Sequence, residues 1–114
     1  MAKGKTPGPI ERRHLVEKEL PSAQALGIAE AYLAEDRVLD AIDFLKIAAA
    51  GGRLAELRAR AIAEGDVFLL RAVATAQGQP PTRDDWQKLE AAATASGRER
   101  YALAARRQVE RGDD

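Results

Sequence analysis

The stretch from Ala25 to Ala48, ALGIAEAYLAEDRVLDAIDFLKIA, decides the fold that the sequence predicts. It consists of two amphipathic segments joined by a polar break at residues 35–37. Small residues occupy the positions where two helices would touch: Ala29, Ala41 and Ala48. Larger residues fill the space between them: Ile28, Tyr32, Val38 and Leu45. Because a single hairpin cannot bury its apolar faces alone, we expect similar hairpins to lie beside it.

The composition of the whole chain favours helices. Its 114 residues are near the usual size of one domain, and Ala, Leu, Glu and Arg, all strong helix formers, are abundant. The aromatic residues are few: one Trp, two Tyr and two Phe. We therefore predict an all-α fold.

Charge and cysteine content narrow the possible functions. The formal net charge is zero, which argues against a chain built to bind nucleic acid, and the absence of cysteine excludes disulfides and thiolate chemistry. No apolar run approaches the roughly 18 residues needed to span a bilayer, and the first residues do not resemble a secretory signal. We expect a cytoplasmic protein without a membrane partner.

The chain divides at its proline and glycine residues. We expect a flexible tail over residues 1–9 and an N-terminal helix over 10–20 that ends before Pro21. This helix either caps the first hairpin or serves as a docking peptide. Three helical hairpins should follow, at about 22–50, 53–78 and 82–111.

Residues at the expected helix ends support these boundaries. Ser22 is a candidate N-cap, and Thr82 with Asp85 has the spacing of a capping box. Gly51 and Gly52 are expected to end the helix that starts near Arg37.

The three hairpins share one register when their central breaks, Asp36, Gly65 and Gly97, are aligned. Apolar or small residues then recur at four, eight and eleven positions before the break and five after it. The first hairpin contributes Tyr32, Ile28, Ala25 and Ala41, the second Ala61, Leu57, Leu54 and Leu70, and the third Ala93, Leu89, Trp86 and Ala102. We expect each of these positions to be buried.

The first hairpin resembles a tetratricopeptide (TPR) repeat. The residues that carry the resemblance are Ala25, Ile28, Ala29, Tyr32, Ala41, Leu45 and Ala48. The third hairpin keeps Trp86, Leu89, Gly97 and Ala102 but has Glu90, Ala93 and Arg106 at other positions of the pattern, and the second has Arg58 and Leu70 where small residues belong. The resemblance implies a right-handed stack of about three antiparallel hairpins, with the N-terminal helix added. An irregular HEAT- or armadillo-like domain is the alternative.

The resemblance also implies a binding surface, because the first helices of successive TPR repeats line a concave groove. The corresponding positions here are Leu26, Glu30, Leu33, Ala55, Ala59, Ile62, Gln87, Ala91 and Thr94. Most of these side chains are small and uncharged, which suits the apolar face of a partner protein or peptide.

The residues needed for catalysis are sparse. His14 is the only imidazole, and Ser22 and Ser96 stand at expected helix ends, so we predict no enzyme and no cofactor or metal. The carboxylates between Glu30 and Asp43 are expected to form a solvated face. Arginines near the C-terminus alternate with Glu99 and Glu110, which favours ordinary pairing on the surface.

Two aromatic residues are candidate docking anchors, Phe44 and Phe68. Phe44 adjoins Leu45, so one of that pair is expected to be exposed. The sequence therefore predicts a non-catalytic protein-interaction module or adaptor. The alternative is a structural or regulatory subunit of a larger or self-associated assembly.

Overall fold

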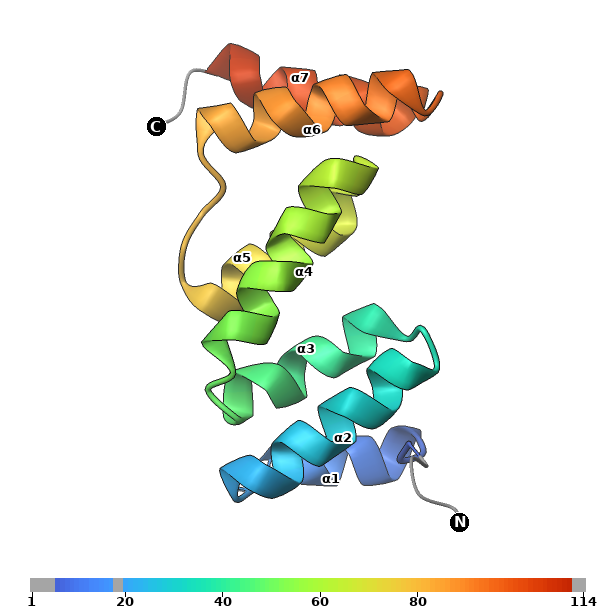
Figure 1. Cartoon of the computed structure of the whole chain (residues 1–114), viewed down its shortest axis with the longest axis vertical. Coiled ribbons are helices and arrows are strands. Elements are labelled where there is room, and N and C mark those ends of the chain that lie inside the picture. The colour runs from blue at the N-terminus through green and yellow to red at the C-terminus, as the bar shows by residue number, and fades with distance from the viewer. Residues whose placement is uncertain (1–5, 18–19, 112–114) are drawn as a thin grey trace. The chain divides into compact units, whose positions relative to one another are not determined.

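The computed structural model describes residues 6–17 and 20–111, and all regular elements within these ranges are α-helices (Figure 1). They are α1 (Pro9–Glu17), α2 (Ser22–Ala34), α3 (Val38–Ile47), α4 (Gly51–Glu64), α5 (Val67–Gln77), α6 (Arg83–Ala95) and α7 (Glu99–Arg111). The predicted all-α class is confirmed. None of these helices is long and apolar enough to cross a membrane.

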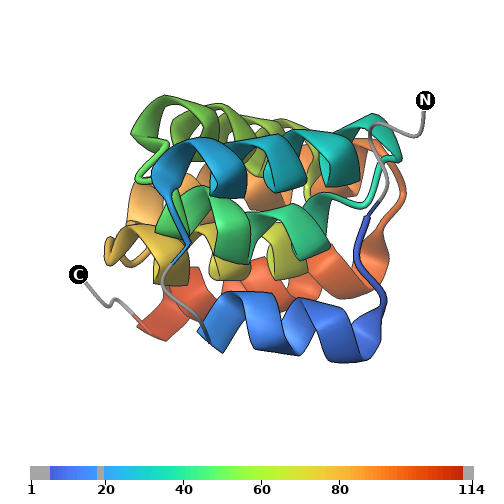
Figure 2. The ribbon, with the colours of Figure 1, turned by 90° about the horizontal axis from the view of Figure 1, so that it is seen from below.

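The chain divides into two compact units, residues 1–54 and 55–114, with α4 beginning in the first and continuing in the second. In the first unit, α3 packs mainly against α2 and also contacts α1 (Figure 2). In the second unit, α6 and α7 lie side by side and α7 also contacts α5 (Figure 1). In both units, helices that follow one another directly in the chain form the main contacts.

The register predicted from the three breaks matches the pattern of burial. Of the twelve aligned positions, Ile28 is half-buried. The others are buried: Ala25, Tyr32, Ala41, Leu54, Leu57, Ala61, Leu70, Trp86, Leu89, Ala93 and Ala102. The aligned positions of α2 to α7 therefore lie on the buried sides of these helices.

The helices α2 to α6 all end in the same backbone turn. In each, one residue takes a left-handed conformation. Two backbone N–H groups that follow the helix donate hydrogen bonds to carbonyl oxygens of its last turn, as in a Schellman motif. At the end of α2, Asp36 has a φ of 60°, the Arg37 N–H donates to Tyr32 O over 2.9 Å, and the Asp36 N–H donates to Leu33 O over 3.0 Å. The left-handed residues of the other four turns are Ala49, Gly65, Gly78 and Gly97.

Some expected helix ends differ from the observed ones. Gly51 and Gly52 do not end a helix but are the first residues of α4, and the turn before them is made by Ala49. Ser22 is the first residue of α2 rather than a side-chain cap, since Pro21 holds the N-cap position. The capping box of Thr82 and Asp85 is confirmed, with both hydrogen bonds at 3.0 Å.

The N-terminal helix is fixed to the first hairpin by Arg12. Its guanidinium donates to Asp40 O and to Asp43 Oδ2, each over 3.0 Å, and lies 5.4 Å from the centre of the Phe44 ring. Before α1, Thr6 accepts a hydrogen bond from Arg37 over 3.1 Å. The helix thus caps the hairpin. Of the expected tail, residues 1–5 lie outside the described ranges, as do residues 18 and 19 of the expected helix.

The conformation of Ala49 leads to a prediction about stability, because this non-glycine residue has a left-handed backbone (φ 55°). We expect Ala49→Gly to raise the free energy of unfolding by about 1 kcal/mol, since glycine adopts this conformation without the steric cost of Cβ. The matched change Ala48→Gly, at a residue with right-handed backbone (φ −75°), should lower it instead. Chemical denaturation of both variants measures the difference, and equal effects would contradict the explanation.

Gly65 makes a second prediction, because a Cβ there would lie 2.7 Å from both the N and the Cα of Ala93 in α6. Gly65→Ala should therefore lower the free energy of unfolding by about 2–4 kcal/mol, because it combines backbone strain with overlap between the new Cβ and Ala93. Gly97 has a similar φ of 76°, but a Cβ there would meet nothing within 4 Å. Gly97→Ala should cost only the strain, about 1 kcal/mol. Thermal unfolding of the two variants separates the contributions, and equal losses would show that the close approach does not matter.

Candidate functional site

The nine positions predicted to line a groove occur three at a time, on α2, α4 and α6. None is fully buried. The exposed ones are Leu26, Ala55, Ala59, Gln87, Ala91 and Thr94, and the half-buried ones are Glu30, Leu33 and Ile62. The three on α2 belong to the first unit and the other six to the second, so a single groove across all nine stays a prediction.

Glu30, the central predicted position on α2, is held in an ion pair. Arg53 donates from Nε to Glu30 Oε2 over 2.8 Å and from Nη2 to Oε1. These hydrogen bonds, aided by the positive charge of Arg53, lower the pKa of Glu30 against the opposing effect of burial. The carboxylate therefore already has a partner within its own unit.

The two candidate anchor residues have opposite environments. Phe44 is fully buried, with its ring 5.8 Å from that of Tyr32, and Leu45 is buried as well. The expectation that one of this pair is exposed was wrong, because α1 and Arg12 cover this part of α3. Phe68, in contrast, is 62% exposed on the first turn of α5.

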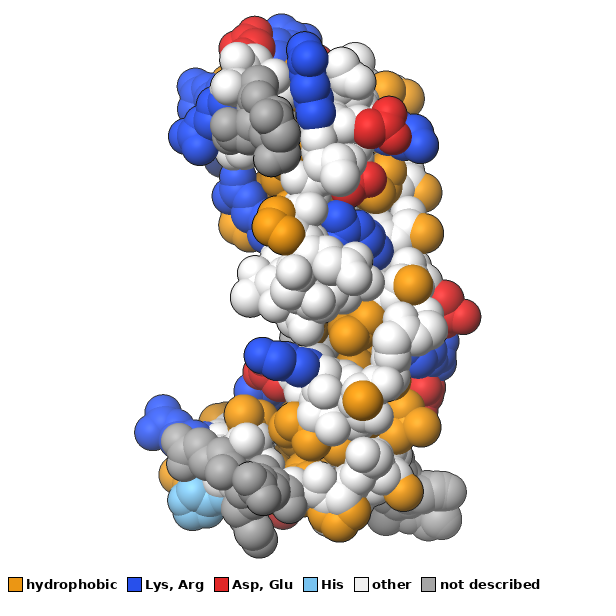
Figure 3. Space-filling model, turned by 90° about the vertical axis from the view of Figure 1, so that its left-hand side faces the viewer, with side chains coloured by type: hydrophobic (Ala, Val, Ile, Leu, Met, Phe, Trp, Pro, Cys, Tyr) orange, Lys and Arg blue, Asp and Glu red, His pale blue; other side chains and the backbone are white. Residues whose placement is uncertain are grey.

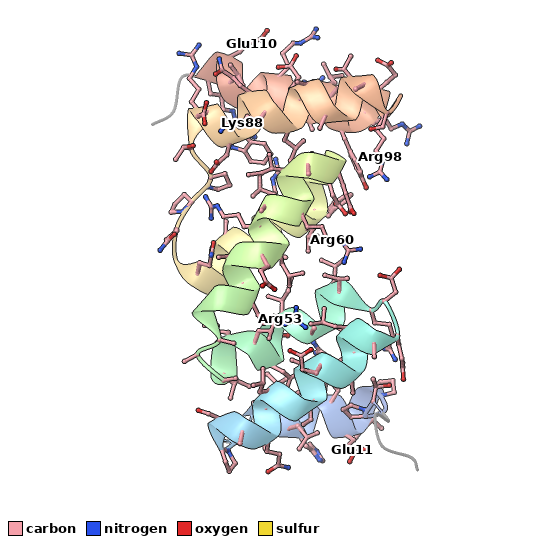
Figure 4. The ribbon with its side chains drawn as sticks, viewed as in Figure 1. Glu11, Arg53, Arg60, Lys88, Arg98 and Glu110 are labelled. Carbon is pink, nitrogen blue, oxygen red and sulfur yellow. The ribbon has the colours of Figure 1, made fainter. Side chains whose placement is uncertain are left out.

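Phe68 lies at an open hollow of about 810 Å³ formed by the N-terminal turns of α5 and α7. Arg98, at the turn between α6 and α7, is one of its charged residues (Figure 4). The remaining lining residues are Val67, Arg71, Glu99, Arg100, Tyr101 and Ala104. The hollow thus combines apolar and aromatic surface with three arginines, all within the second unit.

Contacts among rings and guanidinium groups hold the side chains that line the hollow in place. The Phe68 and Tyr101 rings have centres 5.8 Å apart and are nearly perpendicular, at 79°. The Arg98 guanidinium lies 5.8 Å from the centre of the Tyr101 ring, and that of Arg71 lies 5.6 Å from the Trp86 ring. Two of the three arginines are thereby stacked on aromatic residues of their own unit.

The three arginines of the hollow have no acidic partner among the residues that the structure describes. Among the described residues, no carboxylate oxygen lies within 4.0 Å of a guanidinium nitrogen of Arg71, Arg98 or Arg100. The expected pairing with Glu99 and Glu110 is therefore not found at Arg98 and Arg100. Arg106 pairs across to Glu90 in α6, with 2.9 Å between Nε and Oε2, and it also interacts through charge with Glu110 and Glu99. Further lysine and arginine side chains gather over α6 and α7 on the face shown in Figure 3.

Arg58 has a structural role. It donates to Gln77 Oε1 over 2.7 Å, to Gln79 O over 2.9 Å and to Asp85 Oδ2 over 2.8 Å. It thus joins α4 to the end of α5 and to the capping box of α6. Burial would raise the pKa of Asp85, but hydrogen bonds from Thr82 and Arg58 outweigh it, so the pKa is lowered.

The other candidate polar residues form no chemical site in the described part of the chain. No group of three His, Asp or Glu side chains there is arranged to hold a metal ion. His14 is exposed, and the carboxylates of Asp40 and Asp43 are paired with Arg37 and Arg12.

The sequence points to Phe68 and shows that Arg98 and Arg100 belong to an arginine-rich stretch, but it does not place these arginines beside Phe68 and gives no sign that Arg71 joins them. Phe68 adjoins the buried residues Val67 and Leu69, so its position in the apolar run did not distinguish it from the core. Arg71 and Arg98 lie far apart in the sequence and line the same hollow because α5 contacts α7. Comparison with known proteins adds no assignment, since no family model, curated protein or solved structure matches the chain.

The paired Asp85 predicts a dependence of stability on pH. Because its pKa in the folded chain lies below the ordinary 3.8, ionised Asp85 stabilises the fold above that pH, and this contribution is lost as the pH falls through the lowered pKa. Asp85→Asn should cost about 1–2 kcal/mol at pH 7 and progressively less under acid conditions.

The neighbouring Asp84 provides the control, because it is well exposed and pairs with Lys88 on the same helix. Asp84→Asn should cost under about 0.5 kcal/mol. Urea unfolding at pH 7 and pH 3 measures both variants. If the loss of unfolding free energy in Asp85→Asn were the same at both pH values, ionised Asp85 would not contribute to stability.

Proposed function

We propose that this chain is a non-catalytic protein-binding module, an adaptor, that binds a partner protein or peptide at the hollow between α5 and α7. The observation that supports this most strongly is the exposure of Phe68 beside a depression large enough to accept a partner side chain. An exposed aromatic residue next to a hollow is a typical anchor of protein interfaces, because burying it on association releases much apolar surface from water.

The proposed architecture is a TPR-like stack of three helical hairpins, with a HEAT- or armadillo-like arrangement as the alternative. The shared turn at Asp36, Gly65 and Gly97 and the common register of buried residues support the repeat. In a stack of this kind, the nine positions on α2, α4 and α6 would provide a second surface for the same partner or for another one.

The proposal does not include an enzymatic activity, a cofactor, a membrane or a nucleic acid, and it places the protein in the cytoplasm. The hollow has arginines and aromatic rings but no imidazole, hydroxyl nucleophile or carboxylate pair among its lining residues, apart from the phenol of Tyr101. Such a set can bind and orient a partner, whereas general acid–base or nucleophilic chemistry needs other groups.

Self-association is the second candidate function. Two large apolar residues outside the hollow support it, since Leu39 on α3 is 54% exposed and Leu103 on α7 is 46% exposed. Light scattering over a range of protein concentrations separates the two candidates, because a structural subunit that assembles with itself would grow in mass while an adaptor would stay monomeric.

The adaptor proposal predicts that Phe68→Asp abolishes capture of a partner while leaving the helical content unchanged, because the side chain is exposed. Affinity capture from cell extract, quantified by mass spectrometry, compares this variant with the unaltered chain. We expect proteins captured in stoichiometric amounts to be depleted about tenfold or more by the substitution.

Two variants serve as controls. Leu39→Asp introduces the same charge at an exposed apolar residue of the other unit and should not change capture. Ala59→Arg alters the predicted groove on α4 without touching the hollow. If Ala59→Arg rather than Phe68→Asp removed the partner, the binding surface would be the groove, and if neither did, the hollow would not be a docking site.

A further inference from the structure

We infer that the segment bound in the hollow between α5 and α7 is an acidic peptide with an apolar or aromatic anchor residue. This inference rests on the proposed protein-binding function and adds the chemistry of the partner. It is carried by the combination, in one place, of exposed aromatic surface and three arginines that have no acidic partner among the described residues.

The size and lining of the hollow suit an anchor side chain. A volume of about 810 Å³ lies within the range of roughly 300–1,000 Å³ found for ligand pockets. Phe68, Tyr101 and Ala104 provide apolar surface, and the perpendicular arrangement of the two rings leaves Phe68 largely open to solvent. A leucine or aromatic residue of a partner could pack against Phe68.

The charges around the hollow favour carboxylates. Arg71, Arg98 and Arg100 line it together with a single acidic residue, Glu99. Guanidinium groups bind carboxylates through paired hydrogen bonds, and these three are not engaged by a described carboxylate of their own chain. Because the Arg98 and Arg71 guanidinium groups already lie over the Tyr101 and Trp86 rings, less side-chain freedom is lost when they bind.

A nucleic acid fits the same hollow less well. Binding of single strands uses open aromatic faces for base stacking and a continuous basic track for the phosphates. Here the Tyr101 ring is engaged by both Phe68 and Arg98, Glu99 interrupts the arginines, and the chain has no net charge. A second copy of this chain is also a poor occupant through its α3 face, since the Asp40 and Asp43 carboxylates are already paired.

The experiment is selection of a displayed library of random nonapeptides on the full chain, followed by fluorescence anisotropy with the selected peptides and with a labelled single-stranded oligonucleotide. We expect selected peptides to combine Asp or Glu with a Leu, Phe or Trp. Their affinity should fall about tenfold in the double variant Arg98→Glu, Arg100→Glu and also decrease with added salt.

Arg107→Glu is the control, because Arg107 is an exposed arginine of α7, the helix that carries Arg100, and lies outside the hollow. It should leave the affinity within about twofold. Circular dichroism of each variant checks that the helices are intact. Equal losses in the control and the double variant would indicate general charge attraction and overturn the inference.

The remaining outcomes separate this inference from the proposed function. If the library yields peptides that bind in a Phe68-dependent manner but are not acidic, the docking site stands and the inferred chemistry is wrong. If no selected peptide depends on Phe68, both fail. Tighter binding of the oligonucleotide than of any peptide, or growth in mass of the chain alone with concentration, would also overturn the acidic-peptide inference.

Discussion

The structure depends on one constraint, which is that short helices must reverse direction while keeping their apolar stripes buried. Helices of this length are not stable alone in water, so each needs a neighbour directly after the turn. The chain meets this requirement with one backbone solution at the ends of α2 to α6, a left-handed residue and two reversed hydrogen bonds. The carbonyl that accepts the outer bond belongs each time to a buried residue: Tyr32, Leu45, Ala61, Ala74 or Ala93. Turn and core are therefore coupled at each of these five turns.

This coupling explains why much of the fold could be predicted from the sequence. Glycine at positions 65, 78 and 97 marks a left-handed turn, and the apolar residues before each break follow helical spacing. The turn between α3 and α4 could not be placed in the same way, because its left-handed residue is Ala49 rather than a glycine. Gly51 and Gly52, the glycines nearest to it, start α4 instead.

The candidate site could be predicted only in part. Exposure of Phe68 follows from which side of α5 faces α7, and this depends on the packing of two helices that are distant in sequence. The three arginines come from two helices and a turn, so their gathering is a tertiary property. Arg58 shows the opposite case, since a residue that departs from the repeat pattern proves to hold α4, α5 and α6 together. The sequence indicates such a departure but not its partners.

The close approach of Gly65 to the backbone of Ala93 also bears on evolution. Position 65 cannot gain a side chain unless the α4–α5 turn moves away from α6, and Ala93, beside it, is fully buried, so substitution is restricted at both positions. Descendants of the same ancestor should retain a glycine at 65 together with a small residue at 93, even where the surface has diverged. That pairing gives distant relatives of this chain a signature that overall sequence identity would not reveal.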